Sequence, residues 1–208
     1  GVFPPEPVTS AYMNYDLAEA LSAEFNVTVL RPKPTRPINA DYSSQVLNYN
    51  KPFKCITLST YTHPGASIIG RTRETISFGM ACAKYINENH TNIDFIYNSS
   101  WQLFGYYIVA RAAVKHSIPY IVPIQDIYPE CVLPSNKGGL FGKALFKVLQ
   151  GFDVYYQKHA YLVRTISDEM AKYLSTTRKV SLDKYLVVNN WQDDSAYESL
   201  SPSEHDKV

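Results

Sequence analysis

The sequence is short of cysteine, of long apolar runs and of net charge, and each shortage excludes a class of protein. Its three cysteines, Cys55, Cys82 and Cys131, are widely spaced and form no C-x-x-C pair. That pattern argues against zinc sites and disulfide frameworks and favours a reducing cytosol. No apolar run is long enough to span a bilayer, and no signal peptide is evident. The net charge of +1 argues against a nucleic-acid partner.

The composition that remains is that of a globular protein. The 208 residues are 45% apolar and 19% charged, which is enough for a real core in one large domain or two small ones. No G-x-G-x-x-G follows an expected strand, so hydride transfer with a dinucleotide cofactor has little support. The 17 tyrosines are unusual, but tyrosine lines binding sites and packs cores alike.

Short apolar runs alternate with amphipathic stretches along the chain. The expected strands are 26–30, 53–60, 93–100, 118–126, 161–167 and 185–191, and the expected helices are 11–24, 69–89, 102–116, 140–158 and 168–174, the last capped by Ser167. Each strand is a continuous apolar run, which is typical of strands covered on both faces. The pattern predicts an α/β fold, a Rossmann-like doubly wound parallel sheet with helices on both faces.

The segment "FPPEP", residues 3–7, cannot be helix or central strand, because each proline lacks a donor and restrains its neighbour. A helix follows it, and Thr9 or Ser10 is the expected cap. A doubly wound sheet begins on a strand whose carboxyl end leads into such a loop, so we expect the first strand to precede residue 1. Residues 1–192 would then form one domain, and 193–208 a linker or frayed tail.

Ligands bind such sheets at the carboxyl edge, where the loops after the strands meet. The loop after the fourth strand brings Gln125, Asp126 and Glu130 to that edge. Asp126 is the candidate catalytic residue, and Gln125 and Glu130 are candidates for binding substrate. The alternative is that Asp126 caps a turn and Glu130 is simply solvated.

Two other loops at this edge offer further candidates for binding substrate. Ser99 and Ser100 follow the third strand, although serine at that place is favoured as a helix cap. Trp101 either stacks on a ligand or fills the core, and His63 either enters the site or is an ordinary surface or core residue. Arg71, at a helix start where the dipole opposes a cation, indicates a phosphate ligand or an acidic neighbour.

A stretch from about residue 133 combines apolar and basic side chains. One interpretation is a helix over 140–158 that docks its apolar face on the sheet. Its ordinary solvent-facing stripe would then include Lys143, Lys147, Gln150, Gln157 and Lys158. The other is contact with a membrane, with Leu140 and Phe141 among the acyl chains and Lys137, Lys143 and Lys147 at anionic headgroups.

Four motifs in order resemble glycosyltransferase family 4 and together cover nearly the whole chain. "FPPEPVTSAYMNYDLAEALSAEFNVTVLRP" is similar to the start of many bacterial members, and "YNSSWQLFGYYIVARAAVKHSIPYIVPIQDIYPE" to their next signature. "VRTISDEMAKYL" and "YLVVNNWQDDSAY" are similar to later elements of the family. The resemblance implies one half of a GT-B enzyme, in which two Rossmann-like domains face each other across a cleft.

The resemblance also implies a function. The amino-terminal domain of such enzymes usually holds the acceptor, and the carboxy-terminal domain the UDP- or GDP-linked sugar. This chain would be the acceptor-side half, inactive alone, of a hexosyl- or N-acetylhexosaminyltransferase, with no cofactor besides the donor. The implied acceptor is a saccharide, such as one linked to polyprenyl diphosphate, in capsule, O-antigen, colanic-acid or lipopolysaccharide assembly. The implied location is the cytoplasm, on the inner face of the inner membrane.

The sequence departs from the family at two places. Many members have glycines after FPPEP, where this chain has Val8, Thr9 and Ser10; Ser10 can still donate to an anion at the helix start. Many also have histidine where this chain has Gln125, which cannot transfer a proton. Family members generally retain configuration, so no protein base is required. Two alternatives stay open. One is a nucleotide-sugar 2-epimerase, which would have more acids and histidines at the cleft than this chain offers, and the other is a non-catalytic Rossmann-like module.

Overall fold

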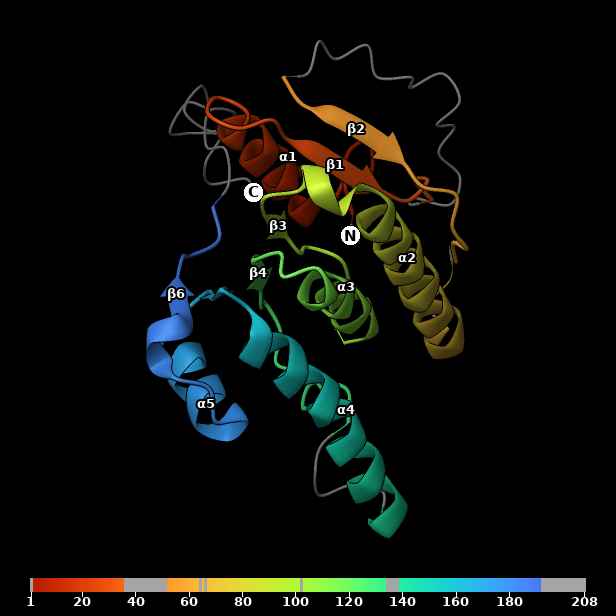
Figure 1. Ribbon diagram of the computed structural model, residues 1–208. Helices are drawn as coiled ribbons and strands as arrows, with labels where there is room; N and C mark the ends of the chain where they lie inside the picture. The colour runs from red at the N-terminus through yellow and green to blue at the C-terminus, as the bar shows by residue number, and fades with distance from the viewer. Residues whose placement is uncertain are drawn as a thin grey trace, which may run out of the picture.

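The structure is a computed structural model that describes residues 2–35, 52–63, 65, 67–101, 103–133 and 139–191 (Figure 1). Its strands are β1 Thr28–Arg31, β2 Lys54–Thr57, β3 Ile96–Tyr97, β4 Tyr120–Pro123, β5 Leu162–Thr165 and β6 Tyr185–Val187. Its helices are α1 Thr9–Leu21, α2 Ile68–Asn89, α3 Phe104–Lys115, α4 Gly139–His159 and α5 Asp168–Arg178, with 3₁₀ turns at His90–Asn92 and Leu182–Lys184. Every expected helix and strand is present, although the strands are shorter than expected.

All the strand pairs are parallel, and the predicted α/β class is confirmed. The strands nevertheless form two sheets among the described residues, and not the single sheet that we expected. One sheet has the order β1-β2 and the other the order β3-β4-β5-β6. Because a helix connects each neighbouring pair of strands in the larger sheet, its loops gather at two opposite edges.

Two of the helix starts are capped by serine. Ser67 accepts from the amide of Gly70 at 3.4 Å, and Ser167 accepts from the amide of Met170 at 3.2 Å, as expected for α5. At α1 the expectation was wrong, because the N-cap is Val8 and no side chain caps the helix. Thr9 and Ser10 already lie in its first turn.

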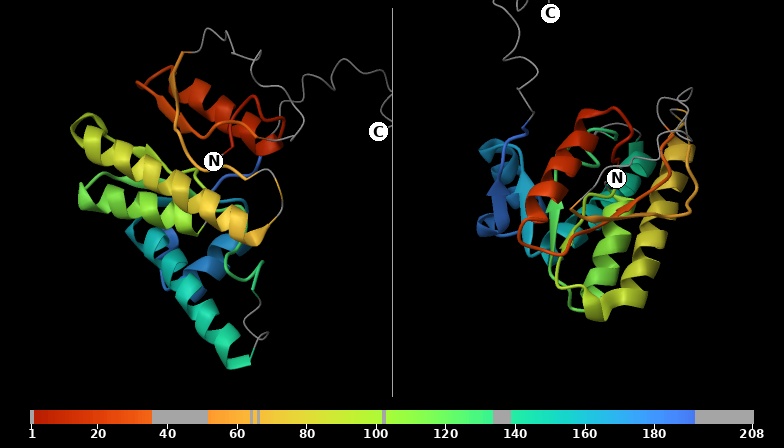
Figure 2. Two further views of the ribbon diagram at one scale, coloured as in Figure 1. Left: turned by 90° about the vertical axis from the view of Figure 1, so that its right-hand side faces the viewer. Right: turned by 90° about the horizontal axis from the view of Figure 1, so that it is seen from above.

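The main core lies between the larger sheet and helices α2, α3 and α4. It includes Phe78, Tyr120, Val122, Tyr156 and Val163, all almost fully buried. Helices α2 and α3 pack side by side along most of their lengths (Figure 2). A second, smaller cluster joins Phe3, Ala18 and Phe53 beneath the two-stranded sheet.

Helix α4 differs in detail from its expected faces. Its described buried residues include Phe146, Asp153, Tyr156 and Gln157. Gln157 had been placed on the wet stripe, but it is fully buried, and its Oε1 accepts from the hydroxyl of Tyr185 at 2.9 Å. The amino-terminal half of α4 extends beyond the rest of the molecule (Figure 1).

Candidate functional site at the carboxyl edge

The carboxyl ends of the strands bring the predicted site residues to one edge. The amide of Asn98 donates to Ile121 O at 2.8 Å, and the amide of Ile124 donates to Arg164 O at 2.7 Å. The first bond extends the β3–β4 pairing to Asn98, and the second extends the β4–β5 pairing to Ile124. The loops after β3 and β4 therefore leave neighbouring parallel strands in the same direction. Asp126 is exposed there, and Gln125 is half-buried.

The FPPEP loop closes this edge beside the smaller sheet. Arg31, the last residue of β1, donates to the carbonyl of Pro4. Glu6 is only 5% exposed, and its Oε1 accepts from the amide of Thr35 at 2.7 Å. Glu6 therefore ties the loop to the chain that follows β1. Sequence reasoning missed this carboxylate, since its partner is 29 residues away.

A second buried carboxylate lies at the start of α2. Glu74 is 2% exposed, its Oε2 lies 3.0 Å from Nη1 of Arg71, and its Oε1 accepts from the amide of His63 at 3.3 Å. The acidic neighbour that we considered for Arg71 is therefore present. Burial raises the pKa of Glu6, and the charge of Glu74 raises it further, while the hydrogen bond from Thr35 opposes the shift. The negative charge of Glu74 therefore disfavours the ionised form of Glu6.

His63 is held against the first turn of α2. Its ring stacks on Tyr61 with 6.4 Å between centroids, and the Tyr61 hydroxyl lies 3.4 Å from Nδ1 of His63. A Cβ on Gly70 would lie 2.3 Å from Cδ2 of this ring, so only glycine leaves room for it. His63, Arg71 and Glu74 consequently form one polar cluster with Tyr61.

The side chains in the loop after β3 make more contacts within the protein than we expected. The Ser100 hydroxyl donates to Oδ1 of Asn98 at 2.7 Å, and Nδ2 of Asn98 donates to Tyr106 O at 3.2 Å. Capping by serine was wrong here, because the N-cap of α3 is Leu103 and no side chain caps it. Trp101 packs edge-on against Phe78 with 5.3 Å between ring centroids, so it adds to the core.

Ser99 and Ser10 are the two remaining serine candidates. Ser99 is half-buried, and its amide donates to Tyr97 O at 3.1 Å. Ser10 is half-buried in the first turn of α1, which begins directly after the FPPEP loop. Ser99 directly follows β3, and the loop before Ser10 is tied to the end of β1 through Pro4, so both serines stay binding candidates.

Glu130 anchors the loop that carries Asp126. Both of its oxygens accept from Arg178, each at 2.7 Å, and Arg178 also donates to Tyr128 O at 2.8 Å and to Asp153. The alternative interpretation, that Glu130 is simply solvated, was wrong, whereas its role as a binding candidate stays a prediction. Burial by itself would lower the pKa of Arg178, but hydrogen bonds and charges from Glu130 and Asp153 outweigh it and raise that pKa.

The segment that follows β6 and ends in Asn190 and Trp191 also contacts this edge. Arg164, 7% exposed, donates to Val188 O at 3.0 Å, and its guanidinium lies 4.9 Å from the centroid of the Trp191 ring. Nε1 of Trp191 donates to Asp16 of α1 at 3.3 Å. Arg164 stands within a β-strand and carried no local signal of this role.

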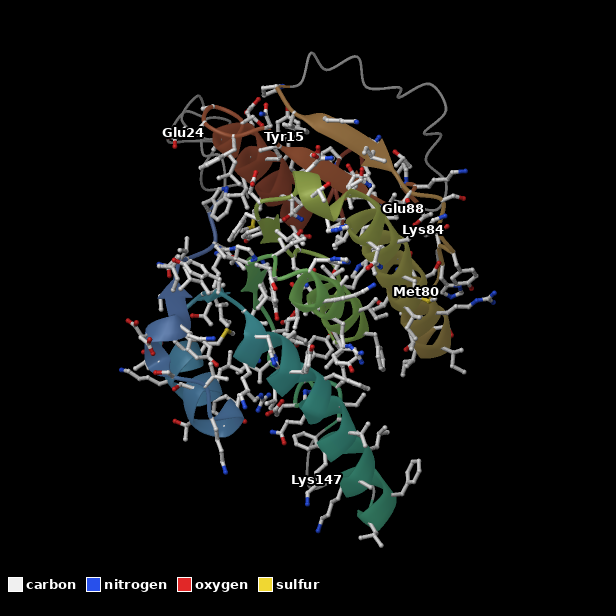
Figure 3. The ribbon with its side chains drawn as sticks, in the orientation of Figure 1. Tyr15, Glu24, Met80, Lys84, Glu88 and Lys147 are labelled. Atoms are coloured by element: carbon white, nitrogen blue, oxygen red, sulfur yellow. The ribbon has the colours of Figure 1, made fainter. Side chains whose placement is uncertain are left out.

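The basic and apolar candidates on α4 are solvent-exposed. Leu140 and Phe141 are 88% and 80% exposed. Lys143 and Lys147 are exposed as well, and Lys147 extends outward from the projecting half of α4 (Figure 3). Lys137 lies outside the described residues. No helix in the described ranges is long and apolar enough to cross a membrane, and no metal-binding group of His, Cys, Asp or Glu occurs in them.

Three solved structures that are similar to this chain are of UGT89C1 of Arabidopsis thaliana, a UDP-glycosyltransferase of the GT-B fold. Its complex with quercetin has a TM-score of 0.54 and 13% identity, over 99% of this chain and 52% of that one. Its complex with UDP-L-rhamnose has a TM-score of 0.55 and 14% identity, over 94% of this chain and 50% of that one. Its complex with UDP has a TM-score of 0.53 and 15% identity, over 94% of this chain and 52% of that one.

These likenesses define the fold class. The chain spans about half the length of the UGT89C1 chains that it matches, and it has the α/β architecture of one half of a GT-B protein. No family model matches the chain, and no curated protein does either.

Proposed function

We propose that this chain is the acceptor-side domain of a glycosyltransferase, which transfers a sugar from a nucleotide-sugar to a saccharide acceptor. The observation that carries the proposal is the fold, which is similar to half of a UDP-glycosyltransferase and gathers polar side chains at the carboxyl edge of its strands. In open α/β sheets this edge is where ligands bind. The second domain would supply most contacts to the UDP- or GDP-linked donor.

The proposed chemistry assigns a role to each polar cluster. Asp126, exposed at the edge, binds a hydroxyl of the acceptor and orients it toward the donor carbon. If the reaction retains configuration, an oxygen of the departing diphosphate accepts the hydroxyl proton, and Asp126 only positions. If it inverts, Asp126 accepts that proton. His63, held beside Glu74, and Gln125 bind further hydroxyls.

The proposal extends to the domain boundaries. Among the described residues, β1 and β3 each pair with a strand on one side only. The FPPEP loop begins at the carboxyl end of β1, where Arg31 donates to Pro4. A parallel strand ahead of residue 1 would fit between β1 and β3 and join the two sheets. The supporting argument is that α1 would then follow a strand, as α3, α4 and α5 do.

Isothermal titration calorimetry tests whether the second domain, and not this chain, binds the nucleotide-sugar. We expect the 208-residue chain to bind neither UDP-glucose, UDP-N-acetylglucosamine nor GDP-mannose tightly, and to turn none of them over. The full-length enzyme should consume one donor of such a panel when a polyprenyl-diphosphate-linked saccharide is added. Tight binding of a nucleotide-sugar by the 208-residue chain would contradict the proposal.

A matched pair of aspartates tests the site itself. Asp126→Asn in the full-length enzyme should raise KM for the acceptor if configuration is retained, and should abolish kcat if it is inverted. Asp94→Asn is the control, since Asp94 is exposed just before β3 at the opposite edge. Equal activity of both variants would remove Asp126 from the site.

One observation favours a second candidate function, the nucleotide-sugar 2-epimerase. That enzyme was expected to place more acids and histidines at the cleft, and Glu6, His63 and Glu74 gather at this edge. An epimerase would interconvert UDP-N-acetylglucosamine and its 2-epimer without any acceptor. Proton NMR of the full-length enzyme with that donor alone distinguishes the two, because a transferase leaves the 2-position unchanged.

A further inference from the structure

Two helix starts expose large apolar side chains in adjacent pairs. Ile68 and Ile69 at the start of α2 are 83% and 82% exposed, and Leu140 and Phe141 at the start of α4 are 88% and 80% exposed. Single apolar residues are common on protein surfaces, but adjacent pairs with so little cover indicate an interaction surface. The sequence pointed to the pair on α4 alone.

The pair on α2 borders a shallow apolar hollow. Its volume is about 330 Å³, and it is lined by Ile68, Ile69, Thr72, Arg73 and Ile76. The guanidinium of Arg73 lies 4.3 Å from the centroid of the Tyr61 ring. An aliphatic group can therefore enter this hollow while a cation remains at its rim.

The charge around both pairs is positive. Neither α2 nor α4 has an acid in its first turn, whereas α5 has Asp168 and Glu169 there. Glu74 offsets Arg71, but no ion pair among the described residues involves Arg73, Lys143 or Lys147. Arg73 and Lys143 lie in the second turns of their helices, on the side where the helix dipole disfavours a cation, and Lys147 lies one turn further along α4. An anionic surface outside the protein would stabilise these cations.

Both helix starts point to the same side of the molecule. In the left view of Figure 2, α2 and α4 both begin at the right-hand side, and both run away from it. A surface on that side of the molecule would therefore meet the starts of both helices. The same side carries the loops of the candidate site, because helices in this fold begin where the strands end.

We propose that the starts of α2 and α4 form a two-point docking surface for an anionic phospholipid bilayer. Ile68, Ile69, Leu140 and Phe141 enter the boundary between headgroups and acyl chains, and the cations meet the headgroup phosphates. The carboxyl edge then faces the lipid, where the saccharide of a lipid-linked acceptor would lie. Only this last point rests on the proposed function.

Sedimentation with vesicles tests the docking without any sugar. The purified protein is mixed with phosphatidylcholine vesicles that contain or lack phosphatidylglycerol, at low and at high salt. We expect binding to the anionic vesicles alone, weakened by salt. Replacing Ile68 and Ile69 together by serine, or Leu140 and Phe141 together, should lower the partition coefficient at least roughly tenfold, because apolar burial is lost.

Charge variants and controls make the test specific. Lys143→Gln with Lys147→Gln should lower partitioning roughly thirtyfold at low salt and much less at high salt. Met80→Ser and Lys84→Gln are the matched controls, since both side chains are exposed on the outer face of α2, 62% for Met80 and 77% for Lys84, and should leave binding unchanged (Figure 3). Circular dichroism checks that each variant is folded.

Three results would overturn the docking surface. Equal binding to neutral and anionic vesicles would remove the role of charge. Serine pairs that bind like the unmodified protein would remove the two helix starts. Self-association that the serine pairs abolish, seen by analytical ultracentrifugation without lipid, would assign the surface to a second copy. Sugar-transfer activity enters none of these measurements, so failure of the proposed function would leave the docking result intact.

Discussion

Arg178 at the end of α5 donates two hydrogen bonds, each of 2.7 Å, to the carboxylate of Glu130 in the loop after β4. The two residues are 48 positions apart in the sequence. Arg178 has a fully buried side chain and also donates to Asp153 of α4. The loop that presents Asp126 is consequently fastened to two helices, and its position depends on a buried charge.

Loss of that charge should be costly. Arg178→Met keeps the volume but leaves Asp153, 1% exposed, without its cationic partner. We expect the free energy of unfolding to fall by about 3–5 kcal/mol, the usual result of breaking a buried ion pair from one side. Urea denaturation followed by circular dichroism measures it. Lys172→Met, at an exposed site on the same helix, should change the stability by less than about 0.5 kcal/mol. Equal stabilities would contradict the assignment.

Two helical glycines give opposite expectations for the same substitution. A Cβ added at Gly151 would have no atom within 4 Å. Gly151→Ala also removes a conformationally free residue from α4, so it should stabilise the protein by up to about 1 kcal/mol. Gly70→Ala places its Cβ 2.3–2.6 Å from atoms of the His63 ring, which must move. We expect no gain, or a loss of about 1–2 kcal/mol, from Gly70→Ala.

Thermal unfolding of the two alanine variants measures this difference. Proton NMR of the His63 ring adds an independent check, because only Gly70→Ala should shift its signals. An equal rise in Tm for both variants would mean that His63 does not pack on α2.

The sequence predicted the elements well and their partners poorly. Continuous apolar runs such as the one that contains Val122 and Ile124 predict strands reliably, because strands that are buried on both faces require such runs. A cap such as Ser167 is also local, and it was predicted. Glu130 was expected either to bind substrate or to be solvated, and Gln157 was expected to face solvent. Their partners Arg178 and Tyr185 lie 48 and 28 residues away. Which polar side chain meets which is decided by packing between distant helices, and no local pattern records it.

In the candidate site too, local patterns predicted where residues lie but not which distant residues they contact. The carboxyl edge follows from strand order, so the placement of Asp126 and Trp101 there required only the α/β pattern. Glu6 and Glu74 were missed because an acid in a proline loop and an acid in a helix normally face water. Each is buried here because it accepts a backbone amide of another segment, that of Thr35 or of His63.

Glu6 should make stability depend on pH. Burial and the charge of Glu74 raise its pKa above the ordinary value of 4.5 in the folded protein. The folded state then holds this proton more tightly than the unfolded chain, so the contribution of Glu6 to stability falls as pH rises from about 4.5 through the raised pKa. Glu6→Gln keeps an oxygen for the Thr35 amide and removes the titration. Between about pH 4 and about pH 7, we expect the free energy of unfolding to fall less for Glu6→Gln than for the unmodified protein.

Urea denaturation at a series of pH values tests this expectation. Glu24→Gln is the control, since Glu24 is exposed and carries the same change in charge. If Glu6→Gln and the unmodified protein have parallel pH profiles, Glu6 titrates alike in the folded and unfolded chains, and the coupling to Glu74 is absent.

The contact between Trp191 and Asp16 joins the end of the described chain to α1. Trp191 donates to Asp16 at 3.3 Å and lies beneath the guanidinium of Arg164. Because the protein has only two tryptophans, Trp101→Phe leaves Trp191 as the single reporter of this contact. In that background, Asp16→Ala should move the emission to longer wavelength and increase quenching by acrylamide, since the indole loses an anchor and meets water. The cost in stability should stay below about 1 kcal/mol for a partly exposed bond. Glu19→Ala, on the same helix, should leave the emission unchanged, and a shift as large as that of Asp16→Ala would show that α1 as a whole, and not this hydrogen bond, holds the segment.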